Sequence, residues 1–257
     1  MGRLHELGKS FLDLLYYSGG ICYLGARSLL GIFTSGQKRR HILAQMNKIG
    51  LDGLPIVFLS ALFMGIVMVF QSAYQLKRLG AKELIAPLVA LSMCRELGPV
   101  FTALAIAGRA GASISAELGT MKVTEQIDAL QTMATDPVKY LVTPRLIALL
   151  TMLPLLTVYA DFIGMFGGYI IAVLKLGVTS SMYITSTFNV LTPKDIFSGL
   201  FKSVVFALII GSVSCFQGLN TEGGAEGVGK ATTLAVVVSF VLIIAADCLF
   251  SALFFFV

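Results

Sequence analysis

The sequence has no tryptophan, only two histidines and few charged residues, and each shortage narrows what the protein can be. Charged residues make up 13% of the chain, against about 25% in a typical soluble domain, whereas hydrophobic residues make up 56%. This balance excludes an ordinary soluble domain and indicates an integral membrane protein. Without tryptophan, anchoring at the membrane surface must depend on Tyr, Lys and Arg.

Side chains that bind metals or form disulfides are also scarce. His5 and His41 have no ligand-like neighbours in the sequence, so we expect no metal site. The four cysteines, which show neither paired nor metal-type spacing, are Cys22, Cys94, Cys215 and Cys248. We therefore expect packing roles and no disulfide framework. With no histidine at membrane depth, a Ser–His–Asp arrangement and hence an intramembrane enzyme are implausible.

Five apolar segments are long enough to cross a bilayer, which requires about 20 mostly apolar residues. They are Leu54–Gln75, Leu84–Ala107, Pro144–Leu174, Phe197–Leu219 and Thr233–Val257. No internal repeat or linker divides the chain, so the sequence predicts one all-α polytopic membrane domain over residues 1–257. Gly164 and Gly168 form a GxxxG pattern in the third segment, for which packing within the chain is the simpler explanation.

Residues 1–50 have a different pattern. Apolar residues recur at helical spacing before Gly19–Gly20, namely Leu4, Leu7, Phe11, Leu14 and Leu15. This pattern predicts an amphipathic helix that lies in the membrane interface and is interrupted at the glycine pair. A signal peptide is the alternative, but a compact apolar core followed by an A-x-A site is missing.

Basic residues predict the orientation. With a cytoplasmic N-terminus, twelve Lys and Arg residues fall in cytoplasmic segments and five in outer segments, which also places Val257 outside. Much of the net charge of +5 precedes the first span, where it suits a membrane surface and does not indicate nucleic-acid binding.

Ionisable residues occur inside the predicted spans. They are Arg95 and Glu96 in the second, Lys202 in the fourth and Asp247 in the fifth, with Asp161 in the third as a candidate fifth member. Charge at membrane depth is costly unless it is paired, so we expect an interhelical network. Such a network could lock the helices together, or its pairs could break and re-form during transport.

A charged segment follows the second span. Small residues crowd Ala105–Ala116, and Arg109 among them marks the cytoplasmic edge of the span. Residues 117–133 are then predicted to form a cytoplasmic helix, which either connects two spans or docks a partner protein. Asp136–Pro137 ends this helix and turns the chain back toward the membrane.

Gly224–Lys230 fits the GxxxxGK spacing of a phosphate-binding loop. However, Ala231 stands where such a loop needs Ser or Thr for Mg²⁺, and no strand precedes the segment. A glycine-rich turn between two spans explains the spacing better, so the chain has no visible ATP-hydrolysing machinery of its own.

The run LVALSMCRELGPVFTALAIAGRAGASISAELGTMKVTEQIDAL, followed by MATDPVKYLVTPR, strongly resembles the MlaE/YrbE family of permeases. These are membrane subunits of ABC transporters that work with MCE proteins on lipids. The resemblance implies a homodimer with an interfacial N-terminal helix and five spans per subunit. It also implies a separate cytoplasmic ATPase that holds ATP and Mg²⁺, a periplasmic MCE protein and, in some systems, a STAS-domain protein. This chain would then carry no cofactor.

The same resemblance assigns residues to roles. ATPase coupling would fall to Glu117, Met121, Lys122, Glu125, Gln126 and Asp128, and the buried charges match the family at Arg95, Glu96, Lys202 and Asp247. An outward-facing lipid pocket at the dimer interface would be lined by Met68, Gln71, Tyr74, Leu76, Leu79 and Leu97. The implied cargo is phospholipid and the implied location is a bacterial inner membrane. The alternative function is a secondary transporter that couples ions or protons through the intramembrane charges.

Overall fold

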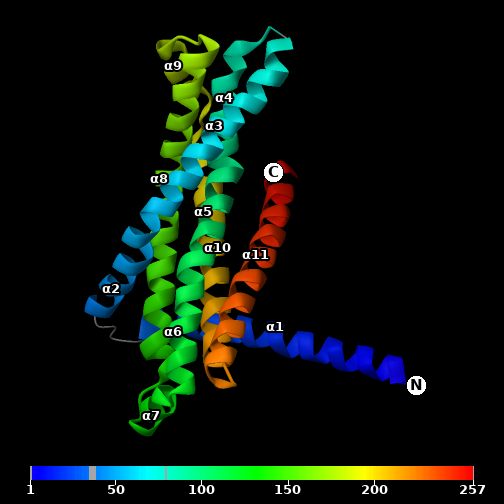
Figure 1. Cartoon of the computed structure of the whole chain (residues 1–257), viewed down its shortest axis with the longest axis vertical. Helices are drawn as coiled ribbons and strands as arrows, with labels where there is room; N and C mark the ends of the chain where they lie inside the picture. Colours follow the sequence, from blue (N-terminus) through cyan, green and yellow to red (C-terminus); the bar gives the residue numbers. More distant parts are fainter. Residues whose placement is uncertain (1, 35–38, 79, 257) are drawn as a thin grey trace.

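The computed structural model describes the backbone of residues 2–34, 39–78 and 80–256, and the side chains of residues 12, 15–31, 39–76 and 80–254. The described residues form a long helical bundle without strands (Figure 1). The helices are α1 (Gly2–Thr34), α2 (Arg39–Gly50), α3 (Leu54–Arg78), α4 (Ile85–Ser92), α5 (Gly98–Ile106), α6 (Ala112–Val123), α7 (Gln126–Thr132), α8 (Thr143–Leu176), α9 (Ser180–Val190), α10 (Pro193–Leu219) and α11 (Gly224–Phe256).

Five stretches are long and apolar enough to cross a membrane, which confirms the predicted number of spans. They are Arg39–Leu76, Lys82–Val123, Val138–Leu176, Pro193–Leu219 and Gly224–Phe254. The first three extend well beyond the apolar runs, because their helices continue into flanking segments that contain charged residues. The second span contains α4, α5 and α6, joined by π-helical turns at Met93–Leu97 and Ala107–Gly111.

The prediction for residues 1–50 needs two corrections. Helix α1 runs without a break through Gly19–Gly20 and lies across the bundle (Figure 1). Helix α2 is not separate from the first span, since it continues through the short 3₁₀ turn Leu51–Gly53 into α3 as the first part of the stretch Arg39–Leu76. The side chains of Leu4, Leu7, Phe11 and Leu14 lie outside the described residues, so the apolar face predicted from them stays a prediction.

Glycine in α1 serves close packing. A Cβ on Gly20 would lie 2.5 Å from the ring of Phe216, and one on Gly25 would lie 2.7 Å from the Ser212 hydroxyl, both on α10. Further along, a Cβ on Gly31 would lie 2.9 Å from the Thr143 hydroxyl at the start of α8. The small residues therefore let α1 approach the bundle, and packing against it stabilises a helix that contains several glycines.

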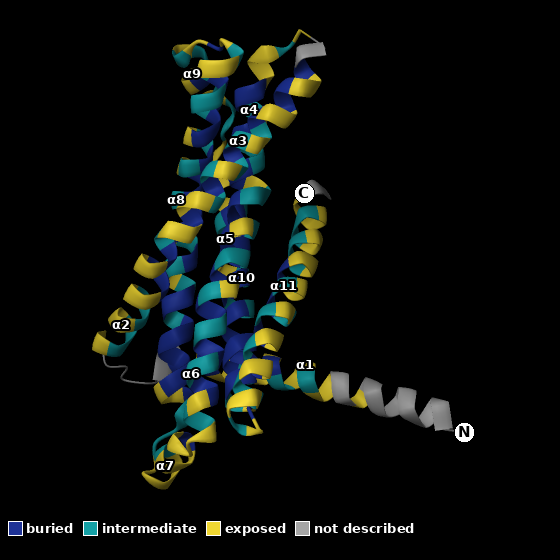
Figure 2. Ribbon diagram, viewed as in Figure 1, coloured by how far each residue is buried: buried dark blue, intermediate teal, exposed yellow. Residues whose placement is uncertain are grey.

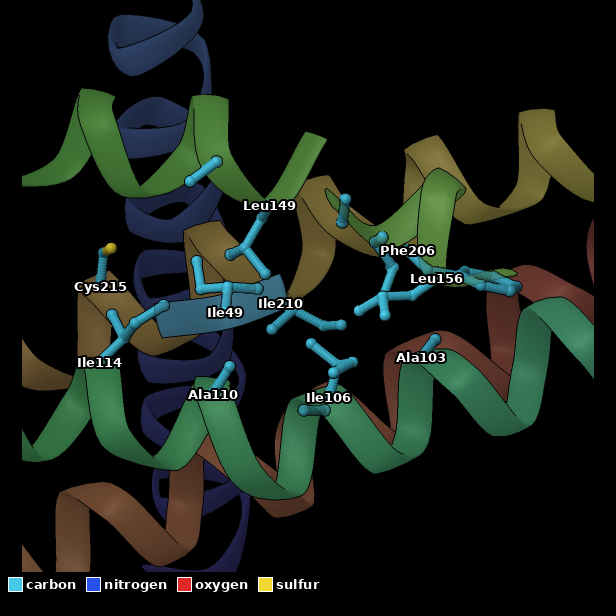
Figure 3. Close-up of a cluster of buried hydrophobic side chains, with 14 of the residues drawn as sticks. Ile49, Ala103, Ile106, Ala110, Ile114, Leu149, Leu156, Phe206, Ile210 and Cys215 are labelled. Atoms are coloured by element: carbon cyan, nitrogen blue, oxygen red, sulfur yellow. The ribbon is translucent and has the colours of Figure 1, made fainter. Parts of the chain in front are cut away.

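The core runs along α10, whose inward side is buried along most of its length (Figure 2). Figure 3 shows how Phe206 and Ile210 of α10 meet Ile106 of α5 and Leu149 and Leu156 of α8 in the main apolar cluster. A second apolar cluster joins α3, α4, α8 and α9. The sequence interpretation did not predict α9, a short helix between the third and fourth spans.

Helices α3 and α8 touch through glycine. A Cβ on Gly65 would lie 1.8 Å from the backbone oxygen of Gly164, and one on Gly167 would lie 2.6 Å from the backbone oxygen of Leu62. Backbone cannot move aside as a side chain can, so these positions require glycine. The GxxxG glycines Gly164 and Gly168 pack within the chain, as predicted.

Replacing Gly65 with Ala should therefore destabilise the fold by about 1–3 kcal/mol, the usual cost of overpacking a tight core. The matched control is Gly229→Ala in α11, where nothing lies within 4 Å of the added Cβ, and this variant should melt like the wild type or slightly higher. Thermal unfolding of the detergent-purified proteins compares the two. Equal melting temperatures for both variants would contradict the close contact between α3 and α8.

Candidate functional site

The helix of the second span is π-helical, and so wider than an α-helix, where Arg95 and Glu96 lie. Pro99 carries no backbone N–H, and its ring would crowd the carbonyl of Arg95 in a regular α-helix. The preceding residues, Met93–Leu97, accordingly form a π-helical turn, a distortion often found at functional sites. Arg95 and Glu96 both belong to this turn, so the proline positions the charged pair.

Lys202 is the centre of a charge cluster that joins three spans. Its side chain is 1% exposed, and its ammonium group donates to Glu96 Oε2 at 2.5 Å, to Asp247 Oδ1 at 2.9 Å and to Ser251 Oγ at 2.8 Å. The Ser251 hydroxyl lies 2.9 Å from Glu96 Oε2 and closes the ring. All three ammonium donors are thus satisfied, which is the condition for a buried charge to be tolerated.

Arg95 pairs with a residue that the sequence interpretation missed. Its Nε donates to Asp195 Oδ1 at 2.5 Å, and its side chain is 57% exposed while that of Asp195 is 2% exposed. The other carboxylate oxygen of Asp195 accepts from the Thr192 backbone and hydroxyl at the start of α10. The sequence T-P-K-D is the signal that could have revealed this capping box.

Asp161 is not part of the charge cluster, contrary to the sequence-based suggestion of a fifth member. Its side chain is buried, and its Oδ1 has no hydrogen-bond partner among the described residues. The carboxyl packs against Gly98, where an added Cβ would lie 1.8 Å from Oδ1. The glycine that follows the π-helical turn therefore provides the space for this carboxyl group.

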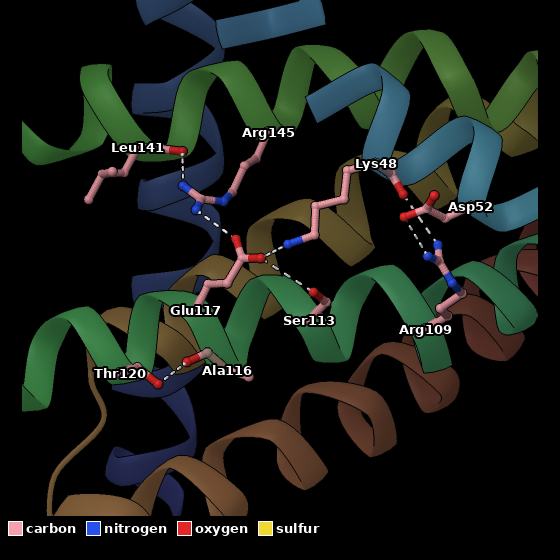
Figure 4. Close-up of polar contacts among 9 residues, drawn as sticks. All are labelled: Lys48, Asp52, Arg109, Ser113, Ala116, Glu117, Thr120, Leu141 and Arg145. Carbon is pink, nitrogen blue, oxygen red and sulfur yellow. Dashed lines mark hydrogen bonds and ion pairs between the residues drawn. The ribbon is translucent and has the colours of Figure 1, made fainter. Parts of the chain in front are cut away.

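A second charge cluster lies nearer the α7 end of the bundle (Figure 4). Glu117 of α6 pairs with Lys48 of α2 and, at 3.0 Å, with Arg145 of α8. Arg109 pairs with Asp52 at 2.9 Å and donates to the Lys48 carbonyl at 3.3 Å. This cluster ties together the first three spans.

The segment predicted as one coupling helix, residues 117–133, is divided. Its first part continues the second span as α6, and a break at Thr124–Glu125, with φ of 59° at Glu125, separates it from α7. Glu117 points toward Lys48 and Arg145, and its predicted role in ATPase docking stays a prediction. This orientation follows from its cationic neighbours on α2 and α8.

The remaining predicted coupling residues lie around the break. Lys122 pairs with Asp128 at 2.9 Å, and Gln126 donates to the Thr124 hydroxyl at 3.0 Å. Ile127 is buried in the main apolar cluster, against which Met121 is also packed, and this contact fixes α7 to the bundle. Glu125, Gln126 and Asp128 remain exposed.

The predicted lipid-lining residues differ in how far they are exposed. Gln71 and Tyr74 are exposed on α3, whereas Met68 and Leu97 are partly buried against the second apolar cluster. Leu76 is only 8% exposed and belongs to that cluster, so within one chain it contributes to packing. Leu79 lies outside the described residues.

The GxxxxGK segment is not a turn, as the sequence suggested, but helix. Gly224–Lys230 forms the first turns of α11, and Lys230 pairs with Glu226 at 2.7 Å one turn away. Gly223 and Gly224, with φ of 84° and 67°, make the turn that precedes it.

Comparisons with known proteins agree along the whole bundle. Residues 42–253 match the family described as Permease MlaE. The chain is 49% identical over 251 residues to a probable ABC transporter permease protein of Rickettsia bellii, covering 98% of this chain and 97% of that protein.

Two further relatives have more specific names. The chain is 35% identical over 256 residues to the intermembrane phospholipid transport system permease protein MlaE of Haemophilus influenzae, covering 98% and 97% of the two chains. It is 40% identical over 216 residues to the chloroplast protein TRIGALACTOSYLDIACYLGLYCEROL 1 of Arabidopsis thaliana, covering 84% of this chain and 62% of that protein.

Removing the ammonium group of Lys202 should be costly. Lys202→Met leaves Glu96 and Asp247 facing each other without a cation, and we expect a loss of about 3–5 kcal/mol in unfolding free energy. Lys230→Met removes a lysine whose side chain is 72% exposed and should change stability by less than about 0.5 kcal/mol.

The triple variant Lys202→Met, Glu96→Gln, Asp247→Asn removes the unpaired charge and should recover part of the loss. Thermal unfolding in detergent measures all three proteins. If Lys202→Met melted like Lys230→Met, the cluster would not hold the spans together.

Proposed function

The chain belongs to the MlaE family of permeases, and from this premise we propose that it is the membrane subunit of an ABC transporter that moves phospholipid between two membranes. The observation that carries the proposal is the alignment with the Haemophilus influenzae phospholipid permease over 98% of the chain. That alignment includes all five candidate spans and both charge clusters.

The permease acts as a homodimer whose interface encloses the lipid. Support comes from α3, where large apolar or aromatic side chains at intervals of three or four residues are exposed, namely Phe63 (60%), Val67 (53%), Phe70 (51%) and Tyr74 (68%). This stripe lies on the same helix as the expected pocket residues Met68 and Gln71. Two such faces would form an apolar wall that shields acyl chains from water.

Energy for transport comes from a separate ATPase that docks on the exposed part of α7. Exposing acyl chains to water costs about 0.8 kcal/mol per CH₂ group, so extraction of a diacyl lipid needs external work. Helix α7 is fixed to the core by Ile127, and α6 leads from it directly to the π-helical turn at Ala107–Gly111. Only the break at Thr124–Glu125 separates α7 from α6, so force on α7 would be transmitted to the second span.

The membrane is the bacterial inner membrane, with the α7 end in the cytoplasm. The excess of Lys and Arg in the segments assigned to the inside supports this orientation. A periplasmic MCE protein receives or delivers lipid at the α4–α9 end, and a STAS-domain protein can complete the ATPase. ATP and Mg²⁺ bind to the partner.

The decisive experiment is purification of the tagged chain from its own membrane in mild detergent, with identification of the proteins and lipids that accompany it. We expect an ATPase, an MCE protein and bound phospholipid. Reconstituted transport should require ATP. Transport by the chain alone, driven by a proton gradient without ATP, would instead favour the secondary transporter.

A charge reversal on α7 should uncouple the ATPase. The pair Glu125→Lys and Asp128→Lys replaces two exposed carboxylates and should weaken ATPase association at least about tenfold, since lost contacts with charged partners each cost more than 1.4 kcal/mol. Glu226→Lys, which alters an exposed carboxylate on α11, is the control and should bind normally. Co-purification yield measures association, and undiminished yield with the double variant would place the docking surface elsewhere.

A further inference from the structure

A hollow of about 250 Å³ lies between α2 and α6, beside the second charge cluster. It is lined by Gln45, Lys48, Ile49, Arg109, Ala110, Ser113, Ile114 and Glu117, and is called here the α2–α6 hollow. One water molecule occupies about 30 Å³ in the liquid, so the hollow has room for something larger than a single water. The floor is apolar and buried, whereas the rim carries amide, hydroxyl, ammonium and guanidinium donors together with the Glu117 carboxylate, which pairs with Lys48 and Arg145. The hollow is therefore suited to a ligand with a polar end.

The two cations of the rim retain donors for a ligand. Figure 4 shows Lys48 directed to Glu117, and Arg109 directed to Asp52 and the Lys48 carbonyl. These contacts engage one of three N–H groups of the lysine and two of five of the arginine. Both side chains are partly exposed, at 47% and 34%, so the remaining donors are accessible.

The cluster has an uneven charge. Three cations, Lys48, Arg109 and Arg145, meet two carboxylates, Asp52 and Glu117, which leaves one positive charge unmatched. Such an unmatched positive charge attracts an anion. A phosphodiester carries one negative charge and oxygens that accept from both lysine and arginine.

The hollow lies at the depth of lipid headgroups. The hydrocarbon layer is about 30 Å thick, which corresponds to about 20 residues of helix. The second apolar segment begins at Leu84, so its hydrocarbon part ends near Leu104. Arg109 then lies about 8 Å beyond that boundary. Likewise Lys48 precedes the apolar run that begins at Leu54 by about 9 Å of helix.

Helix α1 gives an independent measure of this depth. It crosses α10 at Ser212, where a Cβ on Gly25 would lie 2.7 Å from the hydroxyl, while a Cβ on Gly111 would lie 2.9 Å from Ser214 on the same helix. The α2–α6 hollow and the helix that lies across the bundle are therefore level with each other. The sequence predicts that α1 lies in the membrane interface, and an interfacial helix lies at the headgroup layer.

We propose that the α2–α6 hollow binds the phosphate group of a phospholipid in the leaflet at the α7 end, which is the cytoplasmic leaflet in the orientation proposed above. The site is separate from the outward-facing pocket expected at the dimer interface. The inference rests on the proposed function only in taking phospholipid as the ligand.

The test is photolabelling of the full-length chain in nanodiscs with a phospholipid that carries a diazirine on its glycerol backbone. Mass spectrometry should find the label on peptides from α2 and from residues 109–117. The variant Lys48→Gln, Arg109→Gln should reduce this labelling at least about tenfold, because two charged donors are lost. The swap Lys48→Arg, Arg109→Lys keeps both charges and should retain most of it.

Lys230→Gln removes one exposed lysine elsewhere and should leave the labelling unchanged. A diacylglycerol with the same diazirine should label these peptides weakly, and millimolar inorganic phosphate should not compete. Full labelling of the double Gln variant, or equal labelling by diacylglycerol, would overturn the proposal, and competition by free phosphate would assign the site to the free anion. Labelling in α3 near Met68 reports the outer pocket separately, so loss of that signal alone would count against the proposed function and not against this site.

Discussion

The fold depends on the buried ammonium group of Lys202. One positive charge inside the bundle needs partners from other helices, and Glu96, Asp247 and Ser251 come from the second and fifth spans. Because the hydrocarbon layer offers no alternative partners, these contacts set the relative depth of α10, α11 and the π-helical turn before Pro99. Close packing along α10, where a Cβ on Gly199 would lie 2.1 Å from the Cys94 carbonyl oxygen, supports the same register.

The two charge clusters divide the molecule by depth. The Lys202 cluster joins the last two spans to the middle of the second, and the Glu117 cluster joins the first three spans near the α7 end. The second span takes part in both and carries a π-helical turn close to each. A helix with two wide turns can change its twist between fixed points more easily than a regular helix. Motion applied at α7 would therefore change the twist of the second span between the two charge clusters.

The sequence predicted the spans and three members of the central network, Glu96, Lys202 and Asp247, because both follow from composition: apolar runs must cross the membrane, and charges within them must pair. It could not predict which residues pair. Asp195 lies in a polar stretch before the fourth apolar run and reads as part of a loop, yet it is the partner of Arg95. Glu117 reads as surface charge because the cations that hold it, Lys48 and Arg145, are far away in sequence. Gly19–Gly20 reads as a break because the packing that stabilises α1 lies in another helix.

Helix α1 has a consequence for how the bundle sits in the bilayer. Its 33 residues extend about 50 Å, sideways to the bundle axis (Figure 1). Arg27 of this helix pairs at 2.9 Å with Asp136, in the loop between α7 and the third span. If α1 lies in the membrane interface, as the sequence predicts, tilting the bundle would push the part of α1 beyond the bundle into the hydrocarbon layer or lift it into water. The long helix therefore opposes tilting. Under the proposed function, the membrane surface in contact with α1 would resist tilting of the bundle when the ATPase acts on α7.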